Sequence, residues 1–175
     1  MKIAITGHTK GIGKACVDLF DHECIGFSRS NGFDIDKSIT SIVRASKDCD
    51  VFINNAFNYH SQIKMFQEMF NAWKNDSTKT IINVGSRTKY YPVGGTNSPD
   101  YTREKRALHD VVESALFYSK KKCRVITINP GYVDTEMTKG KTAPMLSATK
   151  IAETIKWCMD QPQEVEIGEI SIWVT

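Results

Sequence analysis

The sequence predicts an α/β fold in which a doubly wound parallel sheet lies between two layers of helices. Short apolar stretches alternate with helical patterns along the whole chain. The apolar stretches lack polar alternation, which is typical of parallel strands that are buried on both faces. Polar residues or glycines follow most of these stretches, and parallel strands bring such residues to one edge of the sheet. We expect about seven strands, with some of the covering helices shortened or missing.

Size and composition indicate a single domain, residues 1–175, with enough apolar residues (41%) for a substantial core. A net charge of +3 without a long basic stripe argues against nucleic-acid binding, and no apolar run has membrane-spanning length. Five cysteines without paired spacing indicate reduced thiols and a cytoplasmic location. Neither the cysteines nor the histidines have the spacing of metal ligands, so we expect no metal site.

The first strand and helix are joined by a glycine-rich turn. Met1–Ile5 predicts a buried strand, and the apolar residues of Ile12–Phe20 recur at helical spacing. The turn between them, Thr6–Gly13, has the spacing G-x-x-x-G-x-G. Glycines let the backbone approach an anion closely, and the free N–H groups of a helix start attract phosphate. The turn therefore predicts a phosphate-binding site, and a purely structural glycine turn is the alternative.

The predicted elements after this turn are short at first and longer in the second half of the chain. The interval after the second strand has no room for a full helix. In order, the elements are a strand at Cys24–Ser28, a brief extended segment at Phe33–Asp36, a short helix capped by Ser38, a strand at Asp50–Ala56, an amphipathic helix from about Tyr59 to Asn75, a strand at Thr80–Val84, a loop from Arg87 to Pro99, a helix from near Tyr101, a strand at Arg124–Asn129, a helix capped by Ser147 and a strand at Ile170–Val174.

Two features of this pattern carry chemistry. The strands end in polar or glycine residues that we expect to line one cleft, at Thr6-Gly7, Ser28-Arg29, Asn54-Asn55-Ala56, Gly85-Ser86 and Asn129-Pro130-Gly131. Tyr101 and Lys105 are four residues apart on a helix and share a face. An ammonium group near a phenol lowers the phenol pKa from near ~10 and makes the tyrosine a general acid or base at neutral pH. Such a pair also arises by chance on many helices.

The order of these motifs resembles the short-chain dehydrogenase/reductase family over nearly the whole chain. The matching motifs are the cofactor turn Thr6–Gly13, the strand-end motif Asn54-Asn55-Ala56, the serine strand Ile82–Ser86, the Y-x-x-x-K pair of Tyr101 and Lys105, and the nicotinamide-binding segment Asn129–Thr135. The resemblance implies a Rossmann-type fold. It also implies hydride transfer between a nicotinamide cofactor and a small carbonyl or alcohol.

By this resemblance, Tyr101 is the general acid or base, Ser86 orients the carbonyl oxygen, and Lys105 lowers the Tyr101 pKa and binds the nicotinamide ribose. Counting back from Ser86 suggests Asn58 as the asparagine that many members use in a proton relay. The cofactor-binding residues implied are Gly7, Thr9, Lys10, Gly11, Ile12, Gly13, Ser28, Arg29, Asp34, Ile35, Asn55, Ala56, Tyr101, Lys105, Pro130, Gly131, Val133 and Thr135.

The residues near the second strand favour NADP(H) over NAD(H). NAD-preferring members usually end this strand with a carboxylate for the adenosine ribose, and this chain has Ser28 followed by Arg29. A guanidinium pairs well with the 2′-phosphate of NADP, and Lys10 adds a second cation within the turn. Either cation alone can be an ordinary surface charge.

The chain departs from the family pattern in several places. It is shorter than members commonly are, and the third strand and its helix are reduced to stubs within residues 33–46. Phe57 replaces the glycine that usually follows Asn-Asn-Ala, so an aromatic ring can enter the site. Ser86 and Tyr101 are fifteen residues apart, and we expect the additional residues to bulge within Tyr90–Gly95 at the substrate mouth. The open pocket suits a compact substrate or needs a neighbouring subunit.

Two other functions stay open. A non-catalytic nucleotide-binding protein, acting as a redox sensor or partner subunit, fits the loss of family elements. A hydrolase using Ser86, His109 and Asp134 needs a G-x-S-x-G elbow, but Val84 and Thr88 stand at its glycine positions. The leading prediction is an NADP(H)-dependent oxidoreductase that binds a small molecule, and neither nucleic acid nor membrane. Family members often associate through the fourth and fifth helices, so a homodimer or homotetramer is expected.

Overall fold

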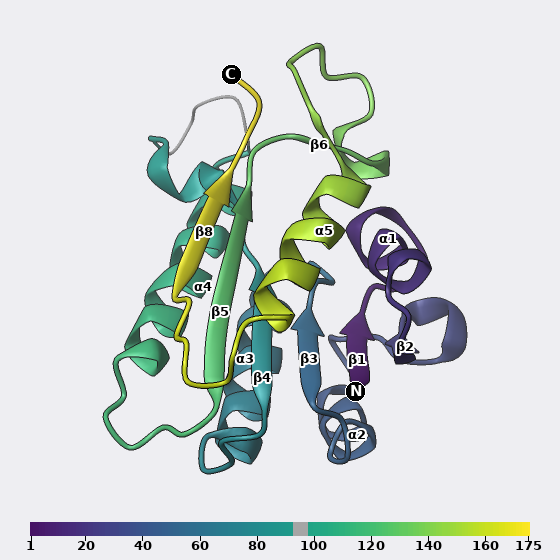
Figure 1. The fold of residues 1–175 in the computed structure, drawn as a ribbon. Helices are drawn as coiled ribbons and strands as arrows, with labels where there is room; N and C mark the ends of the chain where they lie inside the picture. The colour runs from purple at the N-terminus through teal and green to yellow at the C-terminus, as the bar shows by residue number, and fades with distance from the viewer. Residues whose placement is uncertain (93–97) are drawn as a thin grey trace.

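A parallel sheet of six strands runs through the computed structural model, which describes residues 1–92 and 98–175. The strand order is β2-β1-β3-β4-β5-β8, with helices on both faces (Figure 1). This arrangement confirms the predicted doubly wound α/β fold. The strands are β1 (Lys2–Thr6), β2 (Glu23–Phe27), β3 (Val51–Asn54), β4 (Thr80–Val84), β5 (Arg124–Pro130) and β8 (Glu169–Ile172).

Two layers of helices cover the sheet. Helices α1 and α5 pack together on one face, and α2, α3 and α4 follow one another across the other face. The helices are α1 (Gly11–Leu19), α2 (Ile39–Ala45), α3 (His60–Trp73), α4 (Pro99–Leu116) and α5 (Ala148–Met159). Shorter elements are the 3-10 helices η1 (Arg29–Asn31), η2 (Arg87–Tyr90) and η3 (Glu136–Thr138), and a two-stranded sheet of β6 (Val133–Asp134) and β7 (Leu146–Ser147).

The central strands are apolar throughout because each contributes to two cores. In β1, Ile3 and Ile5 pack on the side of α1 and α5, and Ala4 packs on the side of α2, α3 and α4. In β3, Ile53 packs on the side of α1 and α5, and Phe52 packs on the side of α2, α3 and α4. Side chains alternate between the faces of a strand, so a strand covered on both faces needs apolar residues at every position.

The register of the strands aligns their carboxyl ends. Asn54 at the end of β3 pairs with Asn83 of β4, and Val84 at the end of β4 pairs with Ile128 of β5. The strand order reverses beside β1, which has β2 on one side and β3 on the other. The glycine turn that follows β1 therefore lies where ligands bind in open parallel sheets.

The segment Phe33–Asp36 does not form a seventh strand. The backbone oxygen of Asp34 accepts hydrogen bonds from the N–H groups of Lys37 (3.0 Å) and Ser38 (2.7 Å), which turn the chain into α2. A parallel strand needs a crossover of about a dozen residues or more, and only residues 28–32 lie between β2 and this segment. The chain between them is too short to return alongside the edge of the sheet.

The predicted loop from Arg87 to Pro99 begins as the 3-10 helix η2. Helix α4 then begins at Pro99, slightly before the expected position, because the Ser98 Oγ accepts the N–H of Tyr101 (3.2 Å) and caps it. The second half of the expected bulge within Tyr90–Gly95, from residue 93 on, lies outside the described residues.

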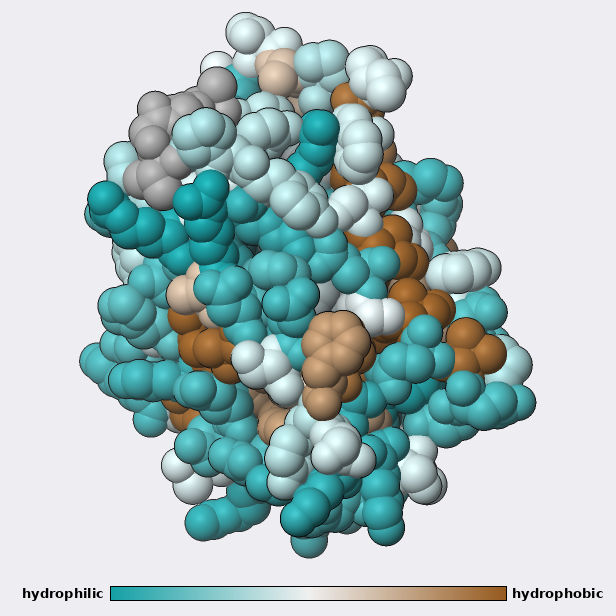
Figure 2. All heavy atoms as spheres, turned by 90° about the vertical axis from the view of Figure 1, so that its left-hand side faces the viewer, coloured by the Kyte–Doolittle hydropathy of each residue, from teal (hydrophilic) through white to brown (hydrophobic). Residues whose placement is uncertain are grey.

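The face that carries α4 and β8 is largely hydrophilic, with hydrophobic side chains gathered toward one side of it (Figure 2). Strand β8 forms one edge of the described sheet, and its Ile170 and Ile172 are only partly buried. None of the described helices is long and apolar enough to cross a bilayer.

Candidate active site

The turn after β1 has the backbone of a phosphate-binding loop. Gly7 (φ 72°) and Gly11 (φ 51°) adopt left-handed conformations that disfavour residues with a Cβ. A Cβ on Gly13 would collide with the carbonyl oxygen of Gly7. Lys10 occupies the N-cap of α1, and no described side chain caps this helix, so its first N–H groups are free to bind an anion. The turn fits the pyrophosphate of a dinucleotide.

Thr6 and Asn55 hold the turn against the end of β3. The Asn55 Nδ2 donates to the backbone oxygens of Thr6 (3.0 Å) and Gly7 (3.3 Å). The Thr6 Oγ1 accepts the N–H groups of Asn55 and Ala56, each at 3.0 Å. These hydrogen bonds between Thr6, Gly7 and the segment after β3 therefore fix the shape of the turn.

The loop after β2 lies beside the same turn. The Gly7 N–H donates to the Phe27 backbone oxygen (2.7 Å), which joins the turn to the end of β2. Ser28 caps η1, with its N–H donating to the Asn31 Oδ1 (2.8 Å), and Arg29 extends from this loop as an exposed cation. Lys10 in the turn is also exposed. The structure thus brings both predicted cations to neighbouring loops of one edge.

Two other predicted cofactor-binding residues, Asp34 and Ile35, have structural roles in this fold. Ile35 is buried in the core on the side of α2, α3 and α4. The Asp34 carboxylate accepts the N–H of Asp36 (3.0 Å) and helps the chain turn into α2.

The segment predicted to hold the nicotinamide lies on the other side of the turn. A Cβ on Gly11 would lie 3.0 Å from the Thr135 Cγ2, so Thr135 borders the glycine turn. The Gly131 N–H donates to the Ile172 backbone oxygen (2.8 Å), which fixes the chain after β5 and its terminal Pro130. Val133 is buried, and its backbone oxygen accepts the Thr138 hydroxyl (2.5 Å).

Ser86 lies two residues after the end of β4, and its side chain lies near Tyr101. The Ser86 Oγ accepts the Thr88 N–H (3.2 Å) and leaves the hydroxyl proton to be donated elsewhere. The Ser86 N–H in turn donates to the Asn129 Oδ1 (3.1 Å) at the end of β5. The Ser86 side chain also lies near enough to Tyr101 to lower the pKa of its phenol. The structure therefore brings these two predicted site residues close together.

Burial raises the pKa of Tyr101 above its usual value, although the nearby Ser86 side chain acts in the opposite direction. The sequence predicted a lowered pKa, caused by Lys105. That prediction is wrong for this structure, since removal of the phenolate from water is the largest effect. The Lys105 Nζ lies against the face of the Tyr101 ring, 5.7 Å from its centroid.

Lys105 is 4% exposed and points into the interior. Its Nζ donates to the Gln62 Oε1 (2.8 Å) and to the Val84 backbone oxygen (3.0 Å), and lies 5.0 Å from the centroid of the Phe57 ring. Burial lowers the pKa of Lys105 to about 7, because the ammonium has lost most of its solvent.

Gln62 is a residue of this site that the sequence argument missed. Its Nε2 donates to the backbone oxygens of Asn54 (2.9 Å) and Val84 (3.0 Å), so its Oε1 is fixed in position to accept from Lys105. The predicted relay residue, Asn58, is exposed, and Gln62 is the α3 side chain that reaches Lys105. A signal was available, because Gln62 is a polar residue on the stripe that carries the buried Met65.

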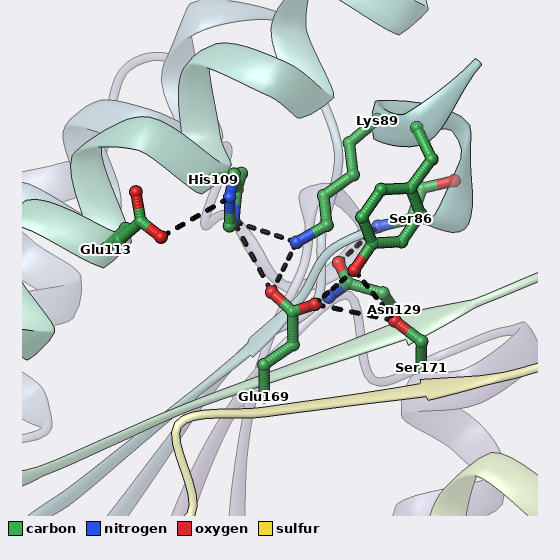
Figure 3. A network of polar contacts seen from close by, with 8 residues as sticks. Ser86, Lys89, His109, Glu113, Asn129, Glu169 and Ser171 are labelled. Carbon is green, nitrogen blue, oxygen red and sulfur yellow. Dashed lines mark hydrogen bonds and ion pairs between the residues drawn. The ribbon is translucent and has the colours of Figure 1, made fainter.

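A second polar cluster fixes the turn that follows Ser86 (Figure 3). From η2, the buried Lys89 forms an ion pair with Glu169 of β8 and a 2.9 Å contact with the Nδ1 of His109 on α4. Tyr90 also donates to Glu169 (2.5 Å). His109 is therefore engaged with Lys89 rather than with Ser86, and this geometry does not support the hydrolase alternative.

A comparison of the sequence with family models shows which family the chain belongs to. Residues 44–145, more than half of the chain, match the model described as short chain dehydrogenase. The chain belongs to the short-chain dehydrogenase family. Among the relatives of this short-chain dehydrogenase, an uncharacterized oxidoreductase of Staphylococcus epidermidis is 28% identical over 163 residues, which cover 91% of this chain and 68% of the relative.

Solved structures share the fold of this short-chain dehydrogenase at lower sequence identity. Serine dehydrogenase from Escherichia coli superposes with a TM-score of 0.78 at 19% identity, covering 98% of this chain and 97% of that one. A short chain dehydrogenase from Burkholderia cenocepacia in complex with NADP has a TM-score of 0.81 at 18% identity, covering 97% and 86%. A 3-ketoacyl-(acyl-carrier-protein) reductase from Brucella melitensis, complexed with NADH, has a TM-score of 0.78 at 16% identity, covering 98% and 96%.

Proposed function

We propose that this short-chain dehydrogenase is an NADP(H)-dependent oxidoreductase that acts on a small carbonyl or alcohol. The observation that carries the proposal is the nearness of the Ser86 side chain to Tyr101, whose ring also lies beside the ammonium of Lys105. These groups lie at the same edge of the sheet as the glycine turn, where a dinucleotide fits. Bound there, the cofactor supplies or accepts the hydride.

Tyr101 is the proposed proton donor in carbonyl reduction. Because burial raises its pKa, the phenol is protonated at neutral pH and can donate from its Oη to the carbonyl oxygen. The position of Tyr101 at the first turn of α4 is fixed by the Ser98 cap.

Ser86 orients the carbonyl oxygen in this proposal. Its Oγ already accepts the Thr88 N–H, so the hydroxyl proton is the part left to interact with substrate. A fixed donor of this kind stabilises negative charge as it develops on the oxygen.

The cofactor is held by the edge residues in this proposal. The free N–H groups of the glycine turn and of α1 bind the pyrophosphate, and Lys105 binds the nicotinamide ribose. Lys10 and Arg29 favour NADP(H), since both are exposed cations on the loops beside the adenosine position. Relatives that share the fold include one in complex with NADP and one complexed with NADH, which supports a nicotinamide cofactor.

The remaining expectations are part of the same proposal. Residues 1–175 act as one NAD(P)-binding domain, and the protein works in the cytoplasm as a homodimer or homotetramer. The partly exposed apolar side chains of the edge strand β8 support association.

Replacement of Tyr101 by phenylalanine tests this function. Reduced nicotinamide consumption is followed with a panel of small aldehydes and ketones. Loss of the proton donor is expected to lower the rate by about 10²–10⁴-fold, while NADPH binding is retained because the ring stays in place. Ser119→Ala, at an exposed position after α4, is a control that keeps full activity.

The same experiment decides between catalysis and the non-catalytic alternative. That alternative has one observation in its favour, since Lys105 is almost completely covered in this structure. Tight NADPH binding, with no turnover of any substrate in the panel by the wild-type protein, would support a nucleotide-binding role instead.

A further inference from the structure

The ammonium of Lys105 is enclosed by protein atoms. Its Nζ donates to the Gln62 side chain and the Val84 backbone oxygen, and the rings of Phe57 and Tyr101 lie 5.0 Å and 5.7 Å away, centroid to Nζ. With Lys105 only 4% exposed, a ribose hydroxyl can contact this ammonium only if one of these four neighbours moves.

Three of the four neighbours are fixed by the fold. Gln62 is 2% exposed and donates two hydrogen bonds to backbone oxygens. Val84 belongs to the central strand β4, and Tyr101 lies in the first turn of α4, where its N–H donates to the capping Ser98. Phe57 lies in neither a helix nor a strand and is only partly buried. Displacement of Phe57 therefore costs less free energy than displacement of any of the other three neighbours.

The segment around Phe57 is anchored at both ends and strained between them. Asn55 is held by the glycine turn, and His60 contacts the Glu104 carboxylate of α4 at 2.9 Å. Between these anchors, Tyr59 has a positive φ of 33°, a strained backbone conformation for a non-glycine residue. Ring contacts hold Phe57 in place, with centroids 5.0 Å from Tyr101 and 5.5 Å from Tyr59.

We propose that Phe57 is a gate over Lys105, which the nicotinamide ribose must displace to reach the ammonium. The proposal rests on the proposed function, since it assumes that Lys105 binds this ribose. It makes Phe57 a determinant of cofactor affinity, because part of the binding free energy is used to replace the contact between the ring and the ammonium. Such a contact is worth about 0.5–2 kcal/mol, which corresponds to about a 2- to 30-fold change in Kd.

Fluorescence titration of the full chain with NADPH tests the gate. Phe57→Ala removes the ring and is expected to tighten binding by about 2- to 30-fold. Phe117→Ala is the matched control, because Phe117 is 75% exposed at the end of α4, and its Kd should equal that of the wild type. An unchanged or weaker affinity in Phe57→Ala overturns the proposal.

A double-mutant cycle separates this effect from general loosening of the loop. In a Lys105→Met background, the gain from Phe57→Ala should disappear, because the ring no longer competes for the ammonium. A gain of the same size in both backgrounds contradicts the gate. If Phe57→Ala does not fold, as judged by its melting curve, Phe57→Leu replaces it and should shift Kd in the same direction by a smaller factor.

The outcomes also separate the gate from the proposed function. If neither the wild type nor Phe57→Ala binds NADPH or NADH, the proposed function fails and the gate fails with it. If the wild type binds NADPH and Phe57→Ala binds no more tightly, the gate alone fails. Binding that appears only in Phe57→Ala supports both.

Discussion

At the level of single residues, burial changes the proton affinity of two side chains in opposite directions. It raises the pKa of Tyr101 and lowers the pKa of Lys105 to about 7, because each charged form has lost solvent. At neutral pH, Tyr101 therefore keeps its proton, while Lys105 is divided between its charged and neutral forms. The site described by the structure is therefore one in which Tyr101 holds its proton and can act as an acid.

The shifted pKa of Lys105 predicts a pH-dependent stability. In the unfolded chain this lysine keeps its proton up to its ordinary pKa of 10.5, while in the folded chain it loses the proton near pH 7. Between these values the unfolded state binds more protons, so this residue makes the free energy of unfolding rise with pH. Urea unfolding from about pH 7 to about pH 9 should show the wild type gaining stability relative to Lys105→Met. Parallel pH profiles for the two proteins would contradict the shift.

At the level of elements, the sequence determines most of the sheet by purely local signals. The glycine turn was predictable because Gly7, Gly11 and Gly13 stand where close backbone approach needs them. The stretch at Phe33–Asp36 has strand-like residues, but the chain that joins it to β2 is too short for a parallel crossover. The segment therefore does not form a strand. Gln62 was missed because its partner Lys105 lies on another helix, and one sequence does not show which helices face each other.

The 3-10 helix η2 shows how one element positions a site residue. It begins directly after Ser86 and is fixed by the Lys89 cluster to β8 and α4 (Figure 3). On α4, Arg106 donates to the Lys89 backbone oxygen (2.9 Å) and is the neighbour of Lys105. The same helix thus carries Tyr101 and Lys105 and holds the turn that follows Ser86.

Loss of the Lys89 ammonium should destabilise the fold measurably. Lys89→Met leaves Glu169 and the His109 Nδ1 without their buried donor, and such a loss costs about 1–3 kcal/mol. Lys150→Met is the matched control, since Lys150 pairs with Glu153 on the exposed face of α5 and such a pair is worth about 0–1 kcal/mol. Urea unfolding of the three proteins gives the comparison, and equal losses in both variants would count against a structural role for the cluster.

At the level of the whole molecule, the proposed preference for NADPH over NADH can come from two electrostatic sources. The chain has a net charge of +3, so the whole protein attracts the extra phosphate of NADPH to some degree. The alternative source is local, in the exposed cations Lys10 and Arg29 beside the proposed adenosine position. Screening by salt limits the long-range attraction to about 8–10 Å, so the local cations should dominate.

Charge-matched variants separate the two sources. Lys10→Ala and Arg29→Ala each remove one positive charge near the turn, and Lys120→Ala removes one from the exposed run after α4. A contact between an exposed cation and a phosphate is worth about 0.2–1 kcal/mol, so each of the first two variants should weaken NADPH binding about 1.5- to 5-fold. NADH binding should change little, because NADH lacks the 2′-phosphate, and Lys120→Ala should leave both affinities unchanged. Titration of each variant with both nucleotides measures the preference, and equal losses in all three variants would show that net charge causes it. A wild type that binds NADH more tightly would show that these cations do not select the cofactor at all.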